Sequence, residues 1–350
     1  MSATTKIEWA TKTWNPLRGC SKVSDGCRNC YAIRQAHRFS GPGMPYEGLT
    51  EKTAAGVNWT GKIRLVSEAL DEPLYWNCKK PERVFVNSMS DLFHPAVPDK
   101  FIDQMFSIMY FVPWHTFIIL TKRPERMLRY MTAPDRKKKI AAWIGTGGVY
   151  PARRGNDRRA QEMVWPLHNV WLGVSVEDQR AADKRIPLLL QTPAAVRLLS
   201  MEPMLGPVDL QYPEGSNPAR WCCDGRECGC GGYPIDPPLI HHIDWVIVGG
   251  ESGPNARPMH PDWVRSIRDQ CVTAGVPFFF KQWGEWAPIP KEGVHVVGCT
   301  ADGNFHYGPN PGVGLAMYRV GKKYAGRMLD GRTWDEYPDA KSFDPGSKKA

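Results

Sequence analysis

Three cysteines near the start of the chain are the residues whose type and spacing point most directly to chemistry. They lie in Trp14-Asn-Pro-Leu-Arg-Gly-Cys20-Ser-Lys-Val-Ser-Asp-Gly-Cys27-Arg-Asn-Cys30-Tyr31, with six residues between the first two and two between the last two. A loop rich in Gly, Ser and Asp can fold back and bring three thiols together. Structural zinc normally has four protein ligands, whereas iron–sulfur clusters are commonly held by cysteines at this density. The pattern predicts a cluster with one iron open to a small molecule.

A zinc site with a fourth ligand elsewhere is the alternative for these thiols, with His37 or His94 as the candidate donor. Gly19 and Gly26 each precede a cysteine, as expected for a loop with unusual backbone angles. Nearby basic residues could offset the negative charge of three thiolates: Arg18, Lys22 and Arg28.

The composition predicts a cytoplasmic protein with one large core. The 350 residues carry ten cysteines, and the N-terminus does not resemble a signal peptide, which together favour a reducing compartment. No apolar run reaches the roughly 18 residues of a membrane span, so we expect no membrane contact. The net charge of +9 suits an anionic partner such as nucleic acid, although solvated basic loops explain it equally well.

Short apolar runs alternate with segments of helical periodicity along the chain. Continuous apolar strands indicate burial on both faces, and their alternation with helices indicates a parallel sheet. The predicted strands are 6–14, 83–87, 116–120, 170–176, 196–200, 245–249 and 276–280. The predicted helices are 31–39, 98–112, 124–131, 178–190 and 261–274.

The fold class predicted from this pattern is α/β, a complete or partial (β/α) barrel. We expect a single domain over residues 1–338, with insertions at about 143–161 and 211–242 and a basic tail at 339–350. A dinucleotide fold is less favoured, because no G-x-G-x-x-G follows the first strand. The segment 57–65 is expected to be a hairpin or a substrate-facing loop.

Polar residues follow nearly every predicted strand, where a barrel places its chemistry. Glycines at 249 and 250 would let a ligand approach the backbone, and the basic side chains could bind a carboxylate or phosphate. Helix capping is the alternative for Ser175 and Asp178, and acid/base hydrolysis with a divalent ion is the alternative for the glutamates. The candidate residues are Ser88, Ser90, Asp91, Lys122, Arg123, Ser175, Glu177, Glu202, Gly249, Gly250, Glu251 and Lys281.

A second group of cysteines lies in the later insertion. Its thiols are Cys222, Cys223, Cys228 and Cys230, followed by the pair His241-His242. The number of ligands suffices for zinc or for a second iron–sulfur cluster, whereas adjacent cysteines seldom bind one metal comfortably and a flexible loop with reduced thiols is the alternative. The isolated thiols are expected to be small buried hydrophobes: Cys78, Cys271 and Cys299.

A barrel-like chain whose first strand leads to a three-cysteine loop resembles the radical S-adenosylmethionine (SAM) superfamily. More closely, the chain looks like a phage- and bacteria-associated three-cysteine family of mostly uncharacterised proteins. Besides the cysteine triplet, the resemblance is carried by Trp14-Asn15-Pro16, Asn87-Ser-Met-Ser-Asp-Leu-Phe93, Leu120-Thr-Lys-Arg-Pro-Glu125, Gly173-Val-Ser-Val-Glu177, Ser200-Met-Glu-Pro203, Gly249-Gly-Glu-Ser-Gly253 and Phe280-Lys-Gln-Trp-Gly284.

The resemblance implies a [4Fe-4S] cluster on Cys20, Cys27 and Cys30, with SAM bound at the open iron. Under this hypothesis we expect the strand-end serines, glycines and carboxylates to bind SAM as a cofactor, and Lys122, Arg123 and Lys281 to bind substrate. The chain departs from the superfamily pattern of three residues and then two between cysteines, and Ser88, Ser90 and Asp91 stand where a glycine-glycine-glutamate element is usual.

The sequence therefore leads to one main hypothesis and two rivals. The main one is a radical SAM-like enzyme that needs a reductant for its cluster and modifies a nucleotide or nucleic-acid base. The first rival is a non-catalytic, zinc-stabilised nucleic-acid-binding protein. The second is a divalent-metal hydrolase or nuclease that uses Glu177, Glu202 and Glu251.

Overall fold

A parallel sheet of seven strands is the main feature of the fold in a computed structural model of the chain. The structure describes residues 5–54, 56–145, 162–211, 238–299, 305–307 and 315–338. The strands lie in the order β1-β6-β7-β8-β9-β10-β11. Their bounds are β1 (Lys12–Trp14), β6 (Arg83–Val86), β7 (Thr116–Thr121), β8 (Val170–Ser175), β9 (Val196–Met201), β10 (Trp245–Gly249) and β11 (Phe278–Gln282).

The order of the strands in the sheet is their order in the chain, which is compatible with a partial (β/α) barrel. Six of the predicted strands are present within two residues of their expected bounds, whereas the first, expected at 6–14, covers only Lys12–Trp14; the predicted helices fall between the strands. The strands form where the apolar runs are continuous: every residue of β8 is buried, and Phe117, Ile118 and Ile119 of β7 are inaccessible to solvent. The α/β class is confirmed.

The chain divides into two compact units, each described separately below. The first contains residues up to Ser175 together with Leu188–Leu198, and the second contains Val176–Pro187 and residues from Leu199 to Pro338. The division passes through β9 and through α6 (Gln179–Gln191). The single-domain assignment therefore stays a prediction.

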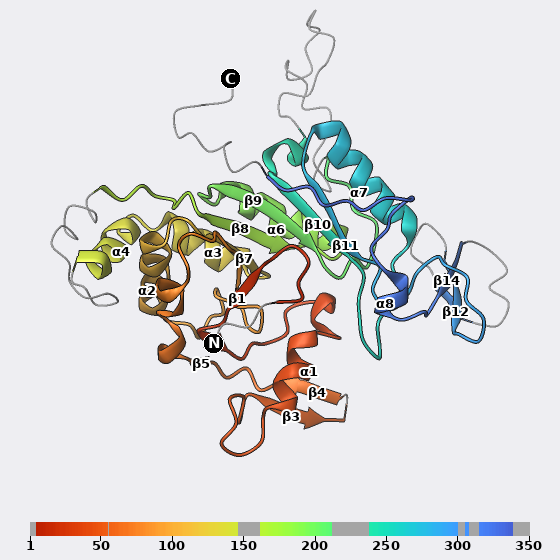
Figure 1. The fold of residues 1–350 in the computed structure, drawn as a ribbon, viewed down its shortest axis with the longest axis horizontal. Coiled ribbons are helices and arrows are strands. Elements are labelled where there is room, and N and C mark those ends of the chain that lie inside the picture. The colour runs from red at the N-terminus through yellow and green to blue at the C-terminus, as the bar shows by residue number, and fades with distance from the viewer. Residues whose placement is uncertain are drawn as a thin grey trace, which may run out of the picture. The chain divides into compact units, whose positions relative to one another are not determined.

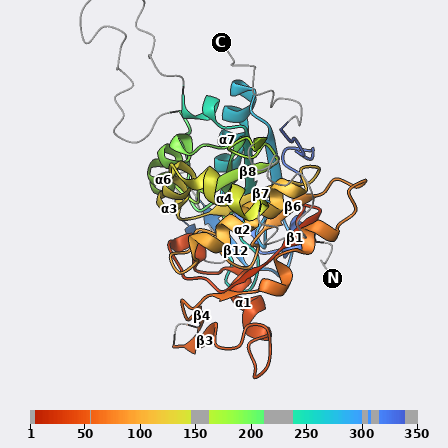
Figure 2. The same ribbon diagram turned by 90° about the vertical axis from the view of Figure 1, so that its left-hand side faces the viewer.

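Three helices of the first unit pack together, because α4 contacts both α2 and α3 (Figure 2). Pro124, at the beginning of α3, suits a first helical position, where a missing N–H costs no hydrogen bond. Buried Arg136 of α4 donates to Asp103 at 2.6 Å and to Asp99 at 2.8 Å, which joins α4 to α2. The helices are α2 (Asp99–Phe111), α3 (Pro124–Thr132) and α4 (Arg136–Gly145).

The segment between β1 and β6 forms a small subassembly of the first unit. The helix α1 (Tyr31–Arg38) packs against a hairpin of β3 (Thr50–Thr53) and β4 (Gly56–Trp59), as Figure 1 shows. The segment expected at 57–65 thus contributes one hairpin strand, β4, and then β5 (Arg64–Leu65), which pairs with β2 (Leu17–Arg18). Short 3₁₀ turns complete the segment: η1 (Asp25–Cys27), η2 (Ser67–Ala69) and η3 (Glu72–Tyr75).

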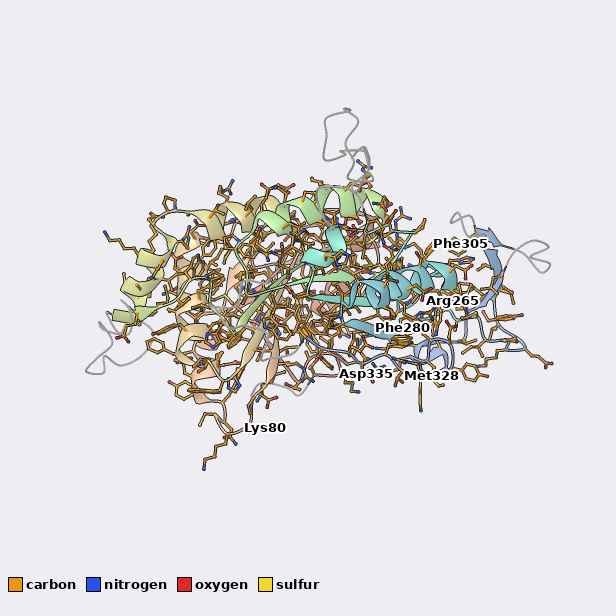
Figure 3. The ribbon with its side chains drawn as sticks, turned by 90° about the horizontal axis from the view of Figure 1, so that it is seen from above. Lys80, Arg265, Phe280, Phe305, Met328 and Asp335 are labelled. Carbon is orange, nitrogen blue, oxygen red and sulfur yellow. The ribbon has the colours of Figure 1, made fainter. Side chains whose placement is uncertain are left out.

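The second unit contains β10, β11 and a separate antiparallel sheet that the sequence pattern did not predict. Gly275, with φ of 68°, ends α7 in the left-handed conformation that glycine adopts without strain. In Figure 3, Phe280 lies beside the segment carrying Met328 and Asp335, and Phe279 pairs with Asp335. The remaining elements are η4 (Leu239–His242), α7 (Pro261–Ala274), β12 (Val296–Cys299), β13 (Phe305–Tyr307), β14 (Leu315–Tyr318) and α8 (Lys322–Ala325).

Two of the sequence predictions concern segments that the structure does not describe. Most of the insertion expected at 143–161, and residues 212–237 of the insertion expected at 211–242, lie outside the described residues, as do Cys222, Cys223, Cys228 and Cys230. Of the helices in the described part of the chain, none combines the length and the apolar character needed to cross a bilayer.

Candidate metal centre and strand-end residues

The three cysteines lie on the loop that leaves β1. Cys27 ends the turn η1, and Cys30 is the residue at which α1 begins. Cys20 and Cys30 both pack against one apolar cluster, formed by buried residues of α1 and of the β3–β4 hairpin. Tertiary packing thus brings together the first and last thiols, which ten positions separate in the chain.

Glycine is required beside Cys20 for a steric reason. Gly19 has φ of 90°, and a Cβ atom there would lie 2.2 Å from the carbonyl oxygen of Lys62. The backbone angle expected of Gly19 is confirmed. Gly26 lies in the 3₁₀ turn η1 and does not have a positive φ, so the expectation of an unusual backbone angle is wrong for Gly26.

Asn15, in the Trp14-Asn15-Pro16 motif, ties the cysteine loop to the loop that follows β6. Its Oδ1 accepts hydrogen bonds from the Ser88 hydroxyl at 3.1 Å and from the Met89 amide at 3.3 Å. The Ser90 hydroxyl donates to the carbonyl of Leu17 at 3.0 Å. Ser88 and Ser90, predicted to bind a cofactor, therefore also position the cysteine loop.

Arg123 joins the cysteine loop to the end of β7. Its Nη2 donates to the carbonyl and to the hydroxyl of Ser21, each at 2.9 Å. Its Nη1 donates to Asp91 at 2.7 Å and lies 3.9 Å from the Sγ of Cys20. Arg123 was predicted to bind substrate; in the structure its guanidinium holds the backbone next to a candidate ligand.

Asp91 receives donors at both carboxylate oxygens. Oδ1 accepts from the Phe93 amide at 2.9 Å and from the Thr121 hydroxyl at 2.8 Å, while Oδ2 accepts from the Lys122 amide at 3.3 Å and from Arg123. Four donors match the acceptor capacity of a carboxylate. Asp91 thus orients Arg123 and the end of β7.

Burial opposes the ionisation of Cys20 and Cys30. Burial, with a smaller contribution from Asp91, raises the pKa of Cys20 to about 12, although the charge of Arg123 acts in the opposite direction. Burial also raises the pKa of Cys30, an effect partly offset by the backbone amides of Ala32 and Ile33 and by the charge of Lys122. A bound cation would supply the charge that stabilises these thiolates.

Two of the three basic residues that the sequence singled out for this role have other contacts. Arg28 pairs with Asp25 at 3.3 Å, and Arg18 donates to the carbonyl of Pro45. The cations that act on the cysteines are Lys122 and Arg123, which follow β7. Lys122 and Arg123 lie near the cysteines because β7 follows β6 and β1 in the sheet, an arrangement that the sequence does not show directly.

Within the described ranges, no three His, Cys, Asp or Glu side chains are arranged to hold a single metal ion. The cysteines of an iron–sulfur cluster need not converge on one atom, because each binds a different iron. The donor set fits such a cluster: it provides three soft ligands on one loop, amides at the beginning of a helix and a guanidinium beside one sulfur.

His94, a candidate fourth zinc ligand, has both ring nitrogens engaged. Nδ1 accepts from the Ala96 amide at 3.2 Å, so Nε2 carries the proton and donates to the Ser21 hydroxyl at 2.9 Å. Burial, together with the charge of Arg123, lowers the pKa of His94 to about 4. His37, the other candidate, contacts Thr50 and Ser40.

We expect acid to destabilise the metal-free protein partly through His94. The folded pKa is below the unfolded value, so this stability is complete above about pH 6.5 and is lost as the pH falls towards 4, at a cost of about 1–2 kcal/mol by pH 5. Urea unfolding at pH 7.5 and pH 5 measures the loss. His94→Gln should lose less stability over this interval; an equal loss in both proteins would contradict the assignment.

Two polar side chains of the first unit have buried atoms without a hydrogen-bond partner: the hydroxyl of Ser24 and both amide atoms of Asn87. Asn87 is 3% exposed and has φ of 57°, an uncommon backbone conformation that asparagine tolerates. An unpaired buried polar group costs about 1–3 kcal/mol. Strain and unpaired groups occur together at functional sites, so Asn87, absent from the sequence-predicted site, joins the candidates.

Glu202 and Lys281 form the strand-end ion pair of the second unit. The Lys281 Nζ lies 2.8 Å from Glu202 Oε1, and the Ser200 hydroxyl donates to Oε2 at 3.3 Å. Both charged side chains are partly exposed. Gly249 lies beside this pair, where a Cβ atom would come within 3.0 Å of Glu202 Oε1.

The other two candidate glutamates are held by arginines of the same unit. Glu177 is 2% exposed and contacts both terminal nitrogens of Arg185, at 2.7 and 3.2 Å. Glu251 accepts from the backbone and the guanidinium of Arg257 at 2.7–2.9 Å. Paired carboxylates of this kind give the hydrolase hypothesis little support, because a divalent ion would have to displace the arginines.

Backbone packing accounts for Gly250, and helix capping for Asp178. A Cβ atom on Gly250 would lie 1.9 Å from the carbonyl of Trp283, so the fold itself requires glycine. Asp178 Oδ1 accepts from the Ala181 amide at 2.8 Å, as the capping alternative predicts. Ser175 is buried at the end of β8, in the first unit.

Comparison with known proteins places these features within one family model. The model of a family described as "Protein of unknown function (DUF5131)" matches residues 4–338. The matched range includes the cysteine loop and all seven strands of the main sheet. No curated protein and no solved structure matches the chain.

Proposed function

The chain belongs to the DUF5131 family, and we propose that it is a radical SAM-like enzyme with a [4Fe-4S] cluster on Cys20, Cys27 and Cys30. One observation carries the proposal: the three-thiol loop leaves the first strand of a parallel sheet and is tied to the ends of the next two strands through Asn15 and Arg123. Parallel α/β sheets place ligands at this edge.

A cluster held by Cys20, Cys27 and Cys30 would supply, with SAM bound, one-electron cleavage of SAM and hydrogen abstraction from the substrate. The protein's contribution is to hold the ligands and exclude water. Asp91 orients Arg123, Arg123 fixes the backbone at Ser21, and the apolar cluster behind Cys20 and Cys30 limits solvent.

Asn87 and Ser24 are the residues that we assign to SAM in the first unit. Both have buried hydrogen-bonding atoms without a protein partner, so a polar ligand gains bonds there without breaking existing ones. By contrast, Asp91 already accepts four donors. In the second unit, the partly exposed pair of Glu202 and Lys281 is the remaining candidate for contact with cofactor or substrate.

We propose a nucleotide or nucleic-acid base as the substrate. The net charge of +9 supports an anionic substrate, and radical chemistry suits carbon centres that acid or base cannot activate. A low-potential reductant is the partner that the cluster requires.

Anaerobic reconstitution followed by reduction in the presence of SAM tests this function. We expect a cluster absorbance that changes when SAM is added, and formation of 5'-deoxyadenosine that requires both SAM and reductant. Protein that contains zinc but neither iron nor sulfide would favour the metal-stabilised binding protein instead. A complete cluster that never cleaves SAM would overturn the proposal.

Asn87→Gly tests the assignment of Asn87 separately from the cluster. Glycine adopts the positive φ without strain, so the variant should fold and bind iron, while its affinity for SAM should fall about tenfold with the loss of one hydrogen bond. Asn77→Gly, at an exposed position, is the matched control. Unchanged SAM affinity in Asn87→Gly would exclude the contact.

A further inference from the structure

Two arginines face each other across the short antiparallel pair of β2 and β5, within the first unit. Arg18 and Arg64 are register partners, and residues directly opposite in such a pair have Cβ atoms about 5 Å apart. Like charges in this arrangement destabilise the pair, so two arginines here are unfavourable unless an anion binds between them. Gly19 and Cys20 follow Arg18 in the chain, which places the pair beside the cysteine loop.

The protein provides these arginines with carbonyl acceptors. Arg18 Nη1 and Arg64 Nη1 donate to the same carbonyl, that of Pro45, at 3.4 and 3.0 Å, and Arg64 Nη2 donates to the carbonyl of Glu47 at 2.8 Å. The carboxylate of Glu47 accepts instead from the Gly43 amide at 2.9 Å. Among the residues that the structure describes, neither arginine pairs with a carboxylate. Each guanidinium has five N–H donors, and Arg64 is exposed and Arg18 partly exposed, so a ligand can reach most of those donors.

The segment that carries the two arginines is strongly basic. Residues 17–65 contain eight Lys or Arg and three Asp or Glu, which gives a net charge of +5 out of +9 for the whole chain. Four further cations of this segment are exposed and have no carboxylate partner within the described ranges: Lys22, Arg38, Lys52 and Lys62. The charge therefore exceeds what one phosphate neutralises, and a strand with several phosphates matches it better than a mononucleotide does.

We propose that Arg18 and Arg64 bind a backbone phosphate of a single-stranded nucleic acid and so place the strand beside the cysteine loop. The planar guanidinium matches the geometry of a phosphate and binds it through paired hydrogen bonds. Two aromatic side chains of the same segment, Tyr31 and Phe39, are 44% and 51% exposed and present rings on which unpaired bases can stack. This inference rests on the proposed function only for the role of the strand as substrate.

Fluorescence anisotropy with the full-length protein and a short, fluorescein-labelled, single-stranded oligodeoxynucleotide is the test. Arg18→Gln and Arg64→Gln should each weaken binding about tenfold at low salt through the loss of a charged hydrogen bond. Each should also reduce the slope of log affinity against log salt concentration by about 0.7, the value for one phosphate contact on a single strand. Lys79→Gln removes an exposed positive charge outside the segment and is the matched control, which should leave both values nearly unchanged.

Urea unfolding separates a ligand site from an anchor of the loop around Pro45. Glutamine keeps an N–H donor and removes the repulsion between the arginines, so both variants should keep or raise the urea midpoint of the wild type. A lower midpoint with undiminished oligonucleotide affinity would assign the arginines to the loop and overturn the proposal. Equal affinity for AMP and for the oligonucleotide would identify a free nucleotide as the ligand and overturn it as well.

The binding assay needs neither SAM nor reductant, so its result is independent of the test of the proposed function. Oligonucleotide binding that depends on Arg18 and Arg64, in a protein that never cleaves SAM, would refute the radical chemistry and leave this site standing. SAM cleavage by a protein that does not bind the oligonucleotide would overturn this inference alone.

Discussion

Serine at position 20, 27 or 30 is expected to abolish the iron–sulfur centre. Wild-type protein reconstituted without oxygen should contain roughly four iron atoms and four sulfides per chain, the composition of one [4Fe-4S] cluster. The iron and sulfide content of each variant should fall close to background, because a serine hydroxyl, a hard oxygen ligand, replaces a soft thiolate. Colorimetric iron and sulfide analysis, together with the visible spectrum, measures the change.

Cys78→Ser is the matched control for these variants. Cys78 was expected to be buried, but it is exposed and lies outside the loop, so its replacement should leave the iron content unchanged. Circular dichroism checks that each variant keeps its secondary structure. Full iron content in any of the three ligand variants would contradict its assignment, and a loss of zinc in place of iron would identify a zinc site.

Replacing Arg123 by methionine is expected to cost about 3 kcal/mol of stability, because it leaves Asp91 buried without its cation. The variant removes the anchor of the cysteine loop at Ser21 as well. Removing a positive charge near Cys20 should also lower the midpoint potential of a reconstituted cluster by on the order of tens of millivolts, because a cation favours the reduced state. Urea unfolding and potentiometric titration give the two values.

Arg123→Lys separates the charge from the geometry. A lysine keeps the charge but cannot contact Asp91 and Ser21 together, so it should restore most of the potential and only part of the stability. Lys139→Met, which breaks an exposed pair with Asp135, is the matched control and should leave stability nearly unchanged. Equal stability losses for Arg123→Met and Lys139→Met would exclude the anchoring role.

Local apolar pattern was sufficient to locate the main sheet. The runs at 116–120 and 245–249 have no polar residue at their centres, and both are buried strands. The antiparallel sheet of β12, β13 and β14 was not predicted, because its strands are short and their stability comes from partners distant in sequence. The hairpin was expected at 57–65, but β3 begins at Thr50 and β5 pairs with β2 instead.

The strand-end glutamates show why residue type alone misassigns roles. Glu177 and Glu251 were predicted to contact a cofactor, yet each forms close ion pairs with an arginine a few positions later, Arg185 or Arg257. Those spacings are visible in the sequence. Only the fold shows that each arginine turns back onto the strand end, because side-chain direction follows from helix and loop geometry.

By itself, the sequence determined the α/β class, the positions of the strands and a three-thiol loop suited to a soft metal centre, because hydrophobic periodicity and ligand chemistry are local properties. The tertiary structure decided which residues surround those thiols. Arg123 and His94 contact the cysteine loop from more than 60 positions away, Asp91 holds Arg123 in place, and Asn87 is left with its amide unpaired. Such contacts depend on how parallel strands align their ends, which no window of sequence contains.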